Sequence, residues 1–109
     1  MGDRINLRFV EEKNGKQLDA PSPVLYAHWD GMSLISGAEL FWNEYKGKIR
    51  TEPSNWMVNF ISYLKNGDVS DGGYYLYPDF KSACSADDNG DWEFNVSTGE
   101  YRQVTNYDL

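Results

Sequence analysis

The side chains best suited to chemistry lie together in one short segment, Tyr26-Ala27-His28-Trp29-Asp30-Gly31. Histidine titrates near neutral pH, and a nearby carboxylate can orient its ring. Asp30 follows His28 by two residues, so both would project from the same face of a continued strand. This spacing fits a hydrolase or nuclease-like enzyme that uses His28 and Asp30, with or without a divalent metal ion. It also makes Tyr26, His28, Trp29 and Asp30 the candidate binding residues.

The same segment has a purely structural interpretation. His28 would hydrogen-bond the end of a strand, Trp29 would fill the core, and Asp30-Gly31 would make a turn. A single histidine without a partner motif is weak evidence for catalysis. We therefore favour the structural interpretation, and the enzyme stays an alternative hypothesis.

Residues 87–91 resemble a calcium-binding loop because Asp87, Asn89 and Asp91 alternate. An EF-hand would then require glycine where Trp92 stands and a bidentate glutamate where Thr98 stands. The Asn89-Gly90 pair is typical of a hairpin turn. We predict a turn here and no metal site.

Cys84 is the single cysteine of the chain, so an internal disulfide is excluded. We predict a small core-filling side chain, and a thiolate paired with His28 is the less favoured alternative. The sequence contains no phosphate-binding glycine loop, no nucleophile elbow and no cysteine or histidine pairs for zinc. We predict no cofactor.

The 109 residues carry 17 acidic and 10 basic side chains, a net charge of −7. Nucleic acids and anionic membranes need concentrated positive charge, so direct binding to either is disfavoured. An acidic surface that docks a basic protein, or one that imitates a phosphate backbone, remains as a hypothesis. The polar start of the chain and its short apolar stretches predict a soluble, cytoplasmic protein without a signal peptide or membrane span.

Hydrophobic periodicity predicts an α+β fold in the order ββααβββ. Ser33 and Thr51 are candidate helix caps, Pro53 suits a first helical turn, and Gly67 suits a helix end. The predicted strands are residues 5–9, 24–29, 74–77, 92–96 and 100–104, the predicted helices are 33–48 and 51–67, and Asn14-Gly15 marks a hairpin turn. We expect one domain over residues 1–109, with a frayed tail at 105–109. It should form a mainly antiparallel sheet of four to five strands with two helices on one face.

Two segments carry a resemblance to other proteins. Residues 24–31, which end in His-Trp-Asp-Gly, and residues 67–77, a Gly-Asp-Val-Ser loop before an aromatic strand, resemble short uncharacterised proteins of phages, plasmids and prokaryotic genomes. In that group Tyr-Pro commonly follows the glycine, where this chain has Met32-Ser33. The resemblance implies a small accessory protein from a mobile element and no particular activity.

Aromatic side chains make up 16% of the chain, and tyrosine and tryptophan are favoured anchors in protein interfaces. Together with the small size and the acidic charge, they favour a non-enzymatic module that binds a protein partner. The strands at 24–27 and 74–77 also offer more apolar surface than two helices cover. We therefore predict an exposed sheet face rich in tyrosine and tryptophan, and a homodimer through a sheet face or edge.

Overall fold

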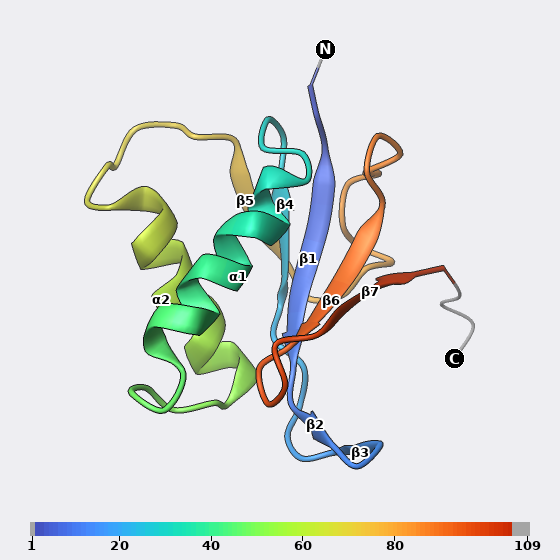
Figure 1. Cartoon of the computed structure of the whole chain (residues 1–109). Coiled ribbons are helices and arrows are strands. Elements are labelled where there is room, and N and C mark those ends of the chain that lie inside the picture. The colour runs from blue at the N-terminus through green and yellow to red at the C-terminus, as the bar shows by residue number, and fades with distance from the viewer. Residues whose placement is uncertain (1, 106–109) are drawn as a thin grey trace.

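The computed structural model describes residues 2–105 (Figure 1). Four strands precede two helices, and three strands follow them. The elements along the chain are β1 (Ile5–Val10), β2 (Glu12–Lys13), β3 (Lys16–Gln17), β4 (Val24–Ala27), α1 (Ser33–Tyr45), α2 (Pro53–Lys65), β5 (Tyr74–Tyr77), β6 (Asp91–Asn95) and β7 (Tyr101–Val104). The predicted order is confirmed, and the short β2–β3 hairpin is added to it.

Five strands form one sheet in the order β5-β4-β1-β6-β7. Neighbouring strands are antiparallel except β1 and β6, which run parallel. A parallel pair cannot be joined by a tight turn, and here both helices and two strands of the sheet lie between β1 and β6 in the sequence. The prediction of a mainly antiparallel α+β sheet is confirmed.

The β2–β3 hairpin forms a separate two-stranded sheet below the main one (Figure 1). Its turn residues have positive φ angles, 56° at Asn14 and 76° at Gly15, as a type I′ turn requires. The Asn-Gly pair is therefore the turn that the sequence predicts.

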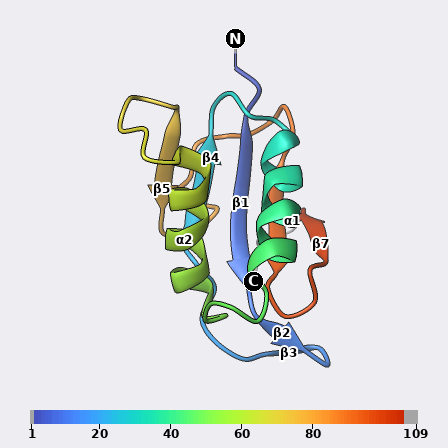
Figure 2. The same cartoon turned by 60° about the vertical axis from the view of Figure 1, so that its left-hand side comes forward.

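Both helices lie on one face of the sheet, α2 on the β5 side and α1 on the β7 side (Figure 2). Every second residue of β1 faces the helices. These residues, Ile5, Leu7 and Phe9, are all fully buried there. Phe60 of α2 meets Phe9 edge-on at 5.3 Å between ring centroids. The main core therefore lies between the helices and this face of the sheet.

The helix ends differ in detail from the predicted caps. Ser33 is the first residue of α1 and its hydroxyl donates to the Asp30 carbonyl, so it caps no backbone N–H. Thr51 lies before α2 and donates to Glu11 instead of capping the helix. Pro53 opens α2 as predicted, because a helix needs no N–H in its first turn.

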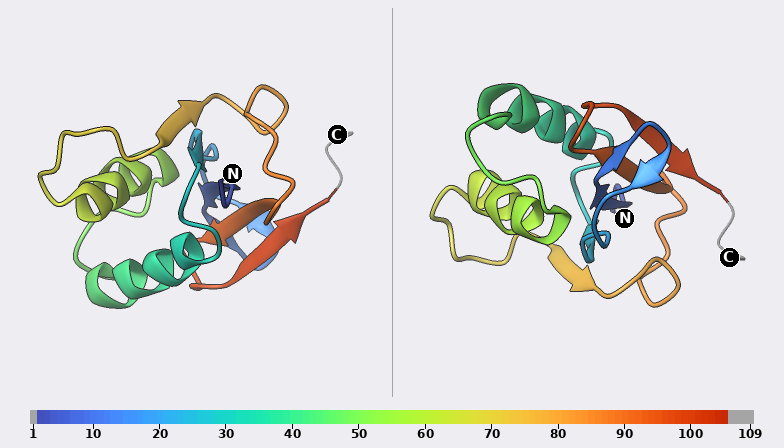
Figure 3. Two further views of the ribbon diagram at one scale, coloured as in Figure 1. Left: turned by 90° about the horizontal axis from the view of Figure 1, so that it is seen from above. Right: turned by 90° about the horizontal axis from the view of Figure 1, so that it is seen from below.

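The other face of the sheet is partly covered by the segment 78–90, which crosses it from β5 to β6 (Figure 3). Phe80 of this segment is buried, and the Arg8 guanidinium lies 4.8 Å from the centre of its ring. Beside it, the buried Glu93 is paired with both Arg8 and Arg102. The prediction of an exposed sheet face rich in tyrosine and tryptophan is therefore wrong for this half of the sheet.

In the part of the chain described here, neither helix has the length and apolar character that crossing a membrane requires. The predicted frayed tail at 105–109 lies, apart from Thr105, outside the described residues.

Candidate functional site

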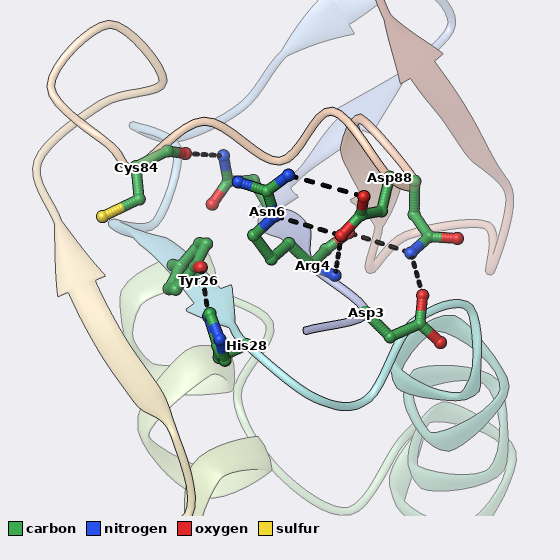
Figure 4. A network of polar contacts seen from close by, with 8 residues as sticks. Asp3, Arg4, Asn6, Tyr26, His28, Cys84 and Asp88 are labelled. Atoms are coloured by element: carbon green, nitrogen blue, oxygen red, sulfur yellow. Dashed lines mark hydrogen bonds and ion pairs between the residues drawn. The ribbon is translucent and has the colours of Figure 1, made fainter. Parts of the chain in front are cut away.

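Tyr26 and His28 form a pair at the end of β4 (Figure 4). The Tyr26 hydroxyl and His28 Nδ1 are 2.6 Å apart, and both residues lie on the side of the sheet away from the helices. Tyr26 is buried, and this burial raises the pKa of its hydroxyl. The ring of Tyr75 on β5 lies 5.9 Å from the Tyr26 ring, centroid to centroid. The pair is therefore held between β4 and β5.

His28 is also fixed through its backbone. Its N–H donates to the Gly73 carbonyl at 2.9 Å, and its carbonyl accepts from the Asp3 N–H at 2.8 Å. A side chain at Gly2 would approach Nε2 to within 2.7 Å, so the start of the chain packs against this nitrogen. The half-buried ring thus lies between the Tyr26 hydroxyl at Nδ1 and the start of the chain at Nε2.

Asp30 has a different partner. Its carboxylate accepts a hydrogen bond of 2.5 Å from the hydroxyl of Tyr74, the first residue of β5. Burial and this bond raise the pKa of the Tyr74 hydroxyl well above its usual range. Tyr26 thus binds His28 and Tyr74 binds Asp30. The catalytic pairing of His28 with Asp30 stays a prediction.

Trp29 is 59% exposed, so the prediction that it fills the core is wrong. Its ring meets the His28 ring edge-on at 4.5 Å and lies over Gly73. Gly73 has a φ angle of +76°, and a Cβ there would lie 2.7 Å from Trp29 Cδ1. Glycine is required at this position because it allows both the backbone conformation and the contact with the indole.

A polar network fastens the crossing segment to β1 and to the residues before it (Figure 4). Arg4 pairs with Asp88 at 3.0 Å, and hydrogen bonds from Arg4 lower the pKa of that carboxyl. Asn89 donates to Asp3 at 2.6 Å, and the Asn6 amide donates to the Cys84 carbonyl at 2.9 Å. These contacts hold the segment in place over the sheet.

The structure corrects two predictions in this network. Cys84 is exposed and its sulfur lies 3.0 Å from the Tyr77 hydroxyl, so it fills no core position. The Asn89-Gly90 pair makes a turn, but no hairpin, since it leads into β6, whose neighbours are β1 and β7. Among residues 2–105, no three His, Cys, Asp or Glu side chains come together in a group that could hold a metal ion.

All four candidate residues contact β5 or the residue before it, and β5 is an edge strand of the sheet. In an antiparallel ladder, hydrogen-bonded and non-bonded pairs alternate. Because the His28 N–H bonds to the Gly73 carbonyl, the pairs Ala27–Tyr74 and Leu25–Leu76 are the non-bonded ones. The N–H and C=O groups of Tyr74 and Leu76 therefore point outward, away from β4.

Exposed apolar side chains surround these outward groups. Trp29, Tyr75 and Leu76 are 59%, 50% and 53% exposed, and together with the outward backbone groups they form what we call the β5 edge surface. A hollow of about 250 Å³ lies beside it, between α2 and β5. Its lining residues are Leu25, Ile61, Lys65, Ser70, Asp71, Gly72, Tyr74, Tyr75 and Leu76.

The opposite edge strand, β7, is protected by charge. Arg102 lies in the middle of β7 and is 70% exposed, while its guanidinium pairs with Glu93 at 2.7 Å. Charged side chains on an edge oppose pairing with another strand. β5 has the sequence Tyr-Tyr-Leu-Tyr and carries no charge. Of the two edges, β5 is the one open to a further strand.

The sequence singles out the segment 26–30 and predicts the strand at 74–77, but not that this strand lies at the edge of the sheet beside the segment. The relevant signal was present, since residues 74–77 are uncharged and Pro78 follows them, as is common at a strand on the edge of a sheet. A short aromatic run is equally typical of an interior strand, so only the strand order of the structure distinguishes an edge strand from an interior one here.

The resemblance of residues 24–31 and 67–77 to short phage and prokaryotic proteins stays a hypothesis. Comparisons with protein-family models, with curated proteins and with solved structures gave no match for this chain.

Proposed function

We propose that this chain is a protein-binding module that adds an extended segment of its partner to the sheet at β5. The single observation that carries the proposal is the uncharged edge strand with four outward backbone groups, at Tyr74 and Leu76. An extended peptide gains affinity from main-chain hydrogen bonds to such an edge, and specificity from the side chains that alternate along it.

The side chains of the β5 edge surface support this proposal. Tryptophan and tyrosine are enriched among the residues that dominate interface energies, and both are half-exposed here at Trp29 and Tyr75. Trp29 is held against Gly73 and His28, so little conformational entropy remains to be lost when a partner covers it. The four candidate binding residues thus act as support and anchor for the edge.

A second copy of the chain is one protein that could pair with β5, and it would give the homodimer predicted from the sequence. Twofold antiparallel pairing centred on Tyr75 would place Tyr75 opposite its copy and Leu76 opposite the partner's Tyr74. Sedimentation equilibrium over a hundredfold concentration range tests this prediction. A single 12.5 kDa species throughout would contradict it.

The experiment that tests the proposed function is a capture from cell lysate with two variants at one position. Leu76→Pro removes the outward N–H, whereas Leu76→Val changes the side chain and keeps the N–H. We expect the wild type and Leu76→Val to capture the same protein, and Leu76→Pro to lose it. Val58→Lys, on the exposed side of α2, is the control for a general surface change.

Equal capture by Leu76→Pro and the wild type would overturn strand addition at β5. Recovery of nucleic acid alone would contradict a protein-binding role altogether. Two alternatives remain predictions: the enzyme that uses His28 and Asp30, and the acidic imitation of a phosphate backbone. Among the described residues, no specific observation favours either of them.

A further inference from the structure

The two ends of β5 differ in charge. Asp30 and Asp71 lie beside its first residues, and Asp68 lies in the loop before it, near Lys65, whose ammonium is 5.7 Å from the centre of the Tyr74 ring. The Lys65 ammonium donates to the Ser70 carbonyl at 2.6 Å, so it is already engaged. The start of β5 and the loop before it therefore carry these three carboxylates and one ammonium, in a chain whose net charge is −7.

Hydrogen bonds hold these carboxylates in place. Asp71 accepts the Gly73 N–H at 2.9 Å, so its carboxylate lies directly beside the point where β5 begins. Hydrogen bonds from Ser70 lower the pKa of Asp68, which favours its ionised form. At the other end of β5, Asp79 and Lys81 follow the strand and balance one another.

The register of the edge fixes which side of an incoming strand meets the hollow. The outward residues Tyr74 and Leu76 have side chains on the helix side of the sheet, in line with Ala27 and Leu25. A partner residue opposite Leu76 would therefore face the same side, at the hollow of about 250 Å³ that Leu76 and Ile61 line. This space accepts one apolar side chain of moderate size.

Resting on the proposed function, we infer that the partner of β5 is a basic extended segment: one apolar residue enters the hollow beside Leu76, and a lysine or arginine near its carboxyl end lies against Asp30 and Asp71. Antiparallel addition places the carboxyl end of the segment at the start of β5, where the carboxylates are. Asp71 lines the hollow as well, so the apolar and the basic contact lie on the same side.

A second copy of the chain fits this chemistry poorly. Two copies would bring net charges of −7 together, and antiparallel pairing would set the carboxylates at the start of each β5 opposite the other copy's Asp79 and Lys81, which offer no excess of positive charge. The residue opposite Leu76 would be the partner's Tyr74, whose hydroxyl is bound to Asp30 within its own chain. Charge complementarity therefore favours a different, basic protein.

Three synthetic peptides test the inference. Each has one central leucine flanked by threonine and valine; the first carries two lysines at its carboxyl end, the second has them at its amino end, and the third has two glutamates at its carboxyl end. Fluorescence anisotropy with the whole chain should show the first peptide binding about fivefold or more tighter than the second, and the third binding weakest. Added salt should reduce these differences.

Matched variants locate the charge effect. Asp71→Asn keeps the oxygen that accepts the Gly73 N–H, and should weaken the first peptide by about twofold to fivefold. Asp79→Asn, at the other end of β5, likewise keeps its bond to Ser82 and should leave the affinity unchanged.

The outcomes separate this inference from the proposed function. Equal affinity for all three peptides, lost in Leu76→Pro, would leave strand addition standing and overturn the basic partner. No peptide binding, although lysate capture depends on Leu76, would also overturn it. A dimer of the wild type that Leu76→Pro abolishes would assign the edge to a second copy and contradict the inference. Peptide affinity unchanged in Leu76→Pro would contradict the proposed function itself.

Discussion

Two proline substitutions at neighbouring positions of β5 should have very different effects on stability. The N–H of Leu76 points away from the sheet, whereas the N–H of Tyr75 lies in a hydrogen-bonded pair with Tyr26 of β4. Proline has no N–H, and it is tolerated on an edge strand only where that group faces solvent. Leu76→Pro should therefore fold, and Tyr75→Pro should disrupt the edge of the sheet.

The magnitudes follow from exposure and hydrogen bonding. Full burial of a leucine side chain contributes roughly 1.5–3 kcal/mol. Leu76 is 53% exposed, so its loss costs about 1 kcal/mol. Proline offsets roughly 0.4–1 kcal/mol of this by restricting the unfolded chain. The net change for Leu76→Pro is therefore about 0–1 kcal/mol.

Tyr75→Pro removes a donor and leaves the carbonyl of the buried Tyr26 without its bond, which costs about 1–3 kcal/mol. The half-buried ring of Tyr75 is lost as well, so the total is about 2–4 kcal/mol. Urea unfolding followed by circular dichroism gives both free energies of unfolding. A loss in Leu76→Pro as large as that in Tyr75→Pro would refute the assigned direction of the β5 backbone groups.

Three further predictions concern the supporting structure, each measured as a free energy of unfolding in urea. Glu93→Ala leaves two guanidinium groups without the buried carboxylate and should cost about 2–4 kcal/mol, whereas Arg102→Ala, at an exposed site, should cost less than about 1 kcal/mol; equal losses would contradict this. Burial raises the pKa of Asp91, so the folded chain binds its proton more tightly than the unfolded chain and stability falls as pH rises from about 4 through the folded-state value. Asp91→Asn should thus stabilise the protein at pH 7 and lose this gain below about pH 4, and a gain independent of pH would argue against it. Gly73→Ala should lower the free energy of unfolding by about 1–3 kcal/mol more than Gly47→Ala, because both residues have positive φ angles but only Gly73 touches an indole. Similar losses for the two variants would show that the Trp29 indole moves aside for a methyl group at position 73.

Local patterns were sufficient for most elements of the fold. Ile5, Leu7 and Phe9 alternate because one face of β1 meets the helices, and that alternation is visible in the sequence. Asn14-Gly15 and Pro53 act through their own backbone geometry, which depends little on the rest of the chain. Such signals are local, so the sequence was enough to place them.

Long-range pairing was beyond these patterns. The hairpin predicted at Asn89-Gly90 is wrong because β6 pairs with β1 in parallel, and β1 is more than 80 residues away in the sequence. Ser33 and Thr51 have good capping side chains, but their hydroxyls find other acceptors in the folded chain. These outcomes depend on which segments become neighbours, and a short window of sequence does not contain that information.

The candidate site was predicted in part. The segment 26–30 could be singled out from its residue types, but the partners of His28 and Asp30 are tyrosines from β4 and β5. Trp29 was expected in the core because it is large and apolar, yet the strand has already ended where it stands. The outward direction of the β5 backbone depends on register, which only the paired structure defines.

Amide hydrogen exchange along β5, resolved by residue with NMR, tests strand addition most directly. In the free protein, the amides of Tyr75 and Tyr77 should be protected by β4, while those of Tyr74 and Leu76 should exchange rapidly. With the leucine peptide that carries lysines at its carboxyl end, Tyr74 and Leu76 should become protected and the other two should change little. Rapid exchange at Tyr74 and Leu76 in the saturated complex, or protection of both in the free protein, would contradict the account.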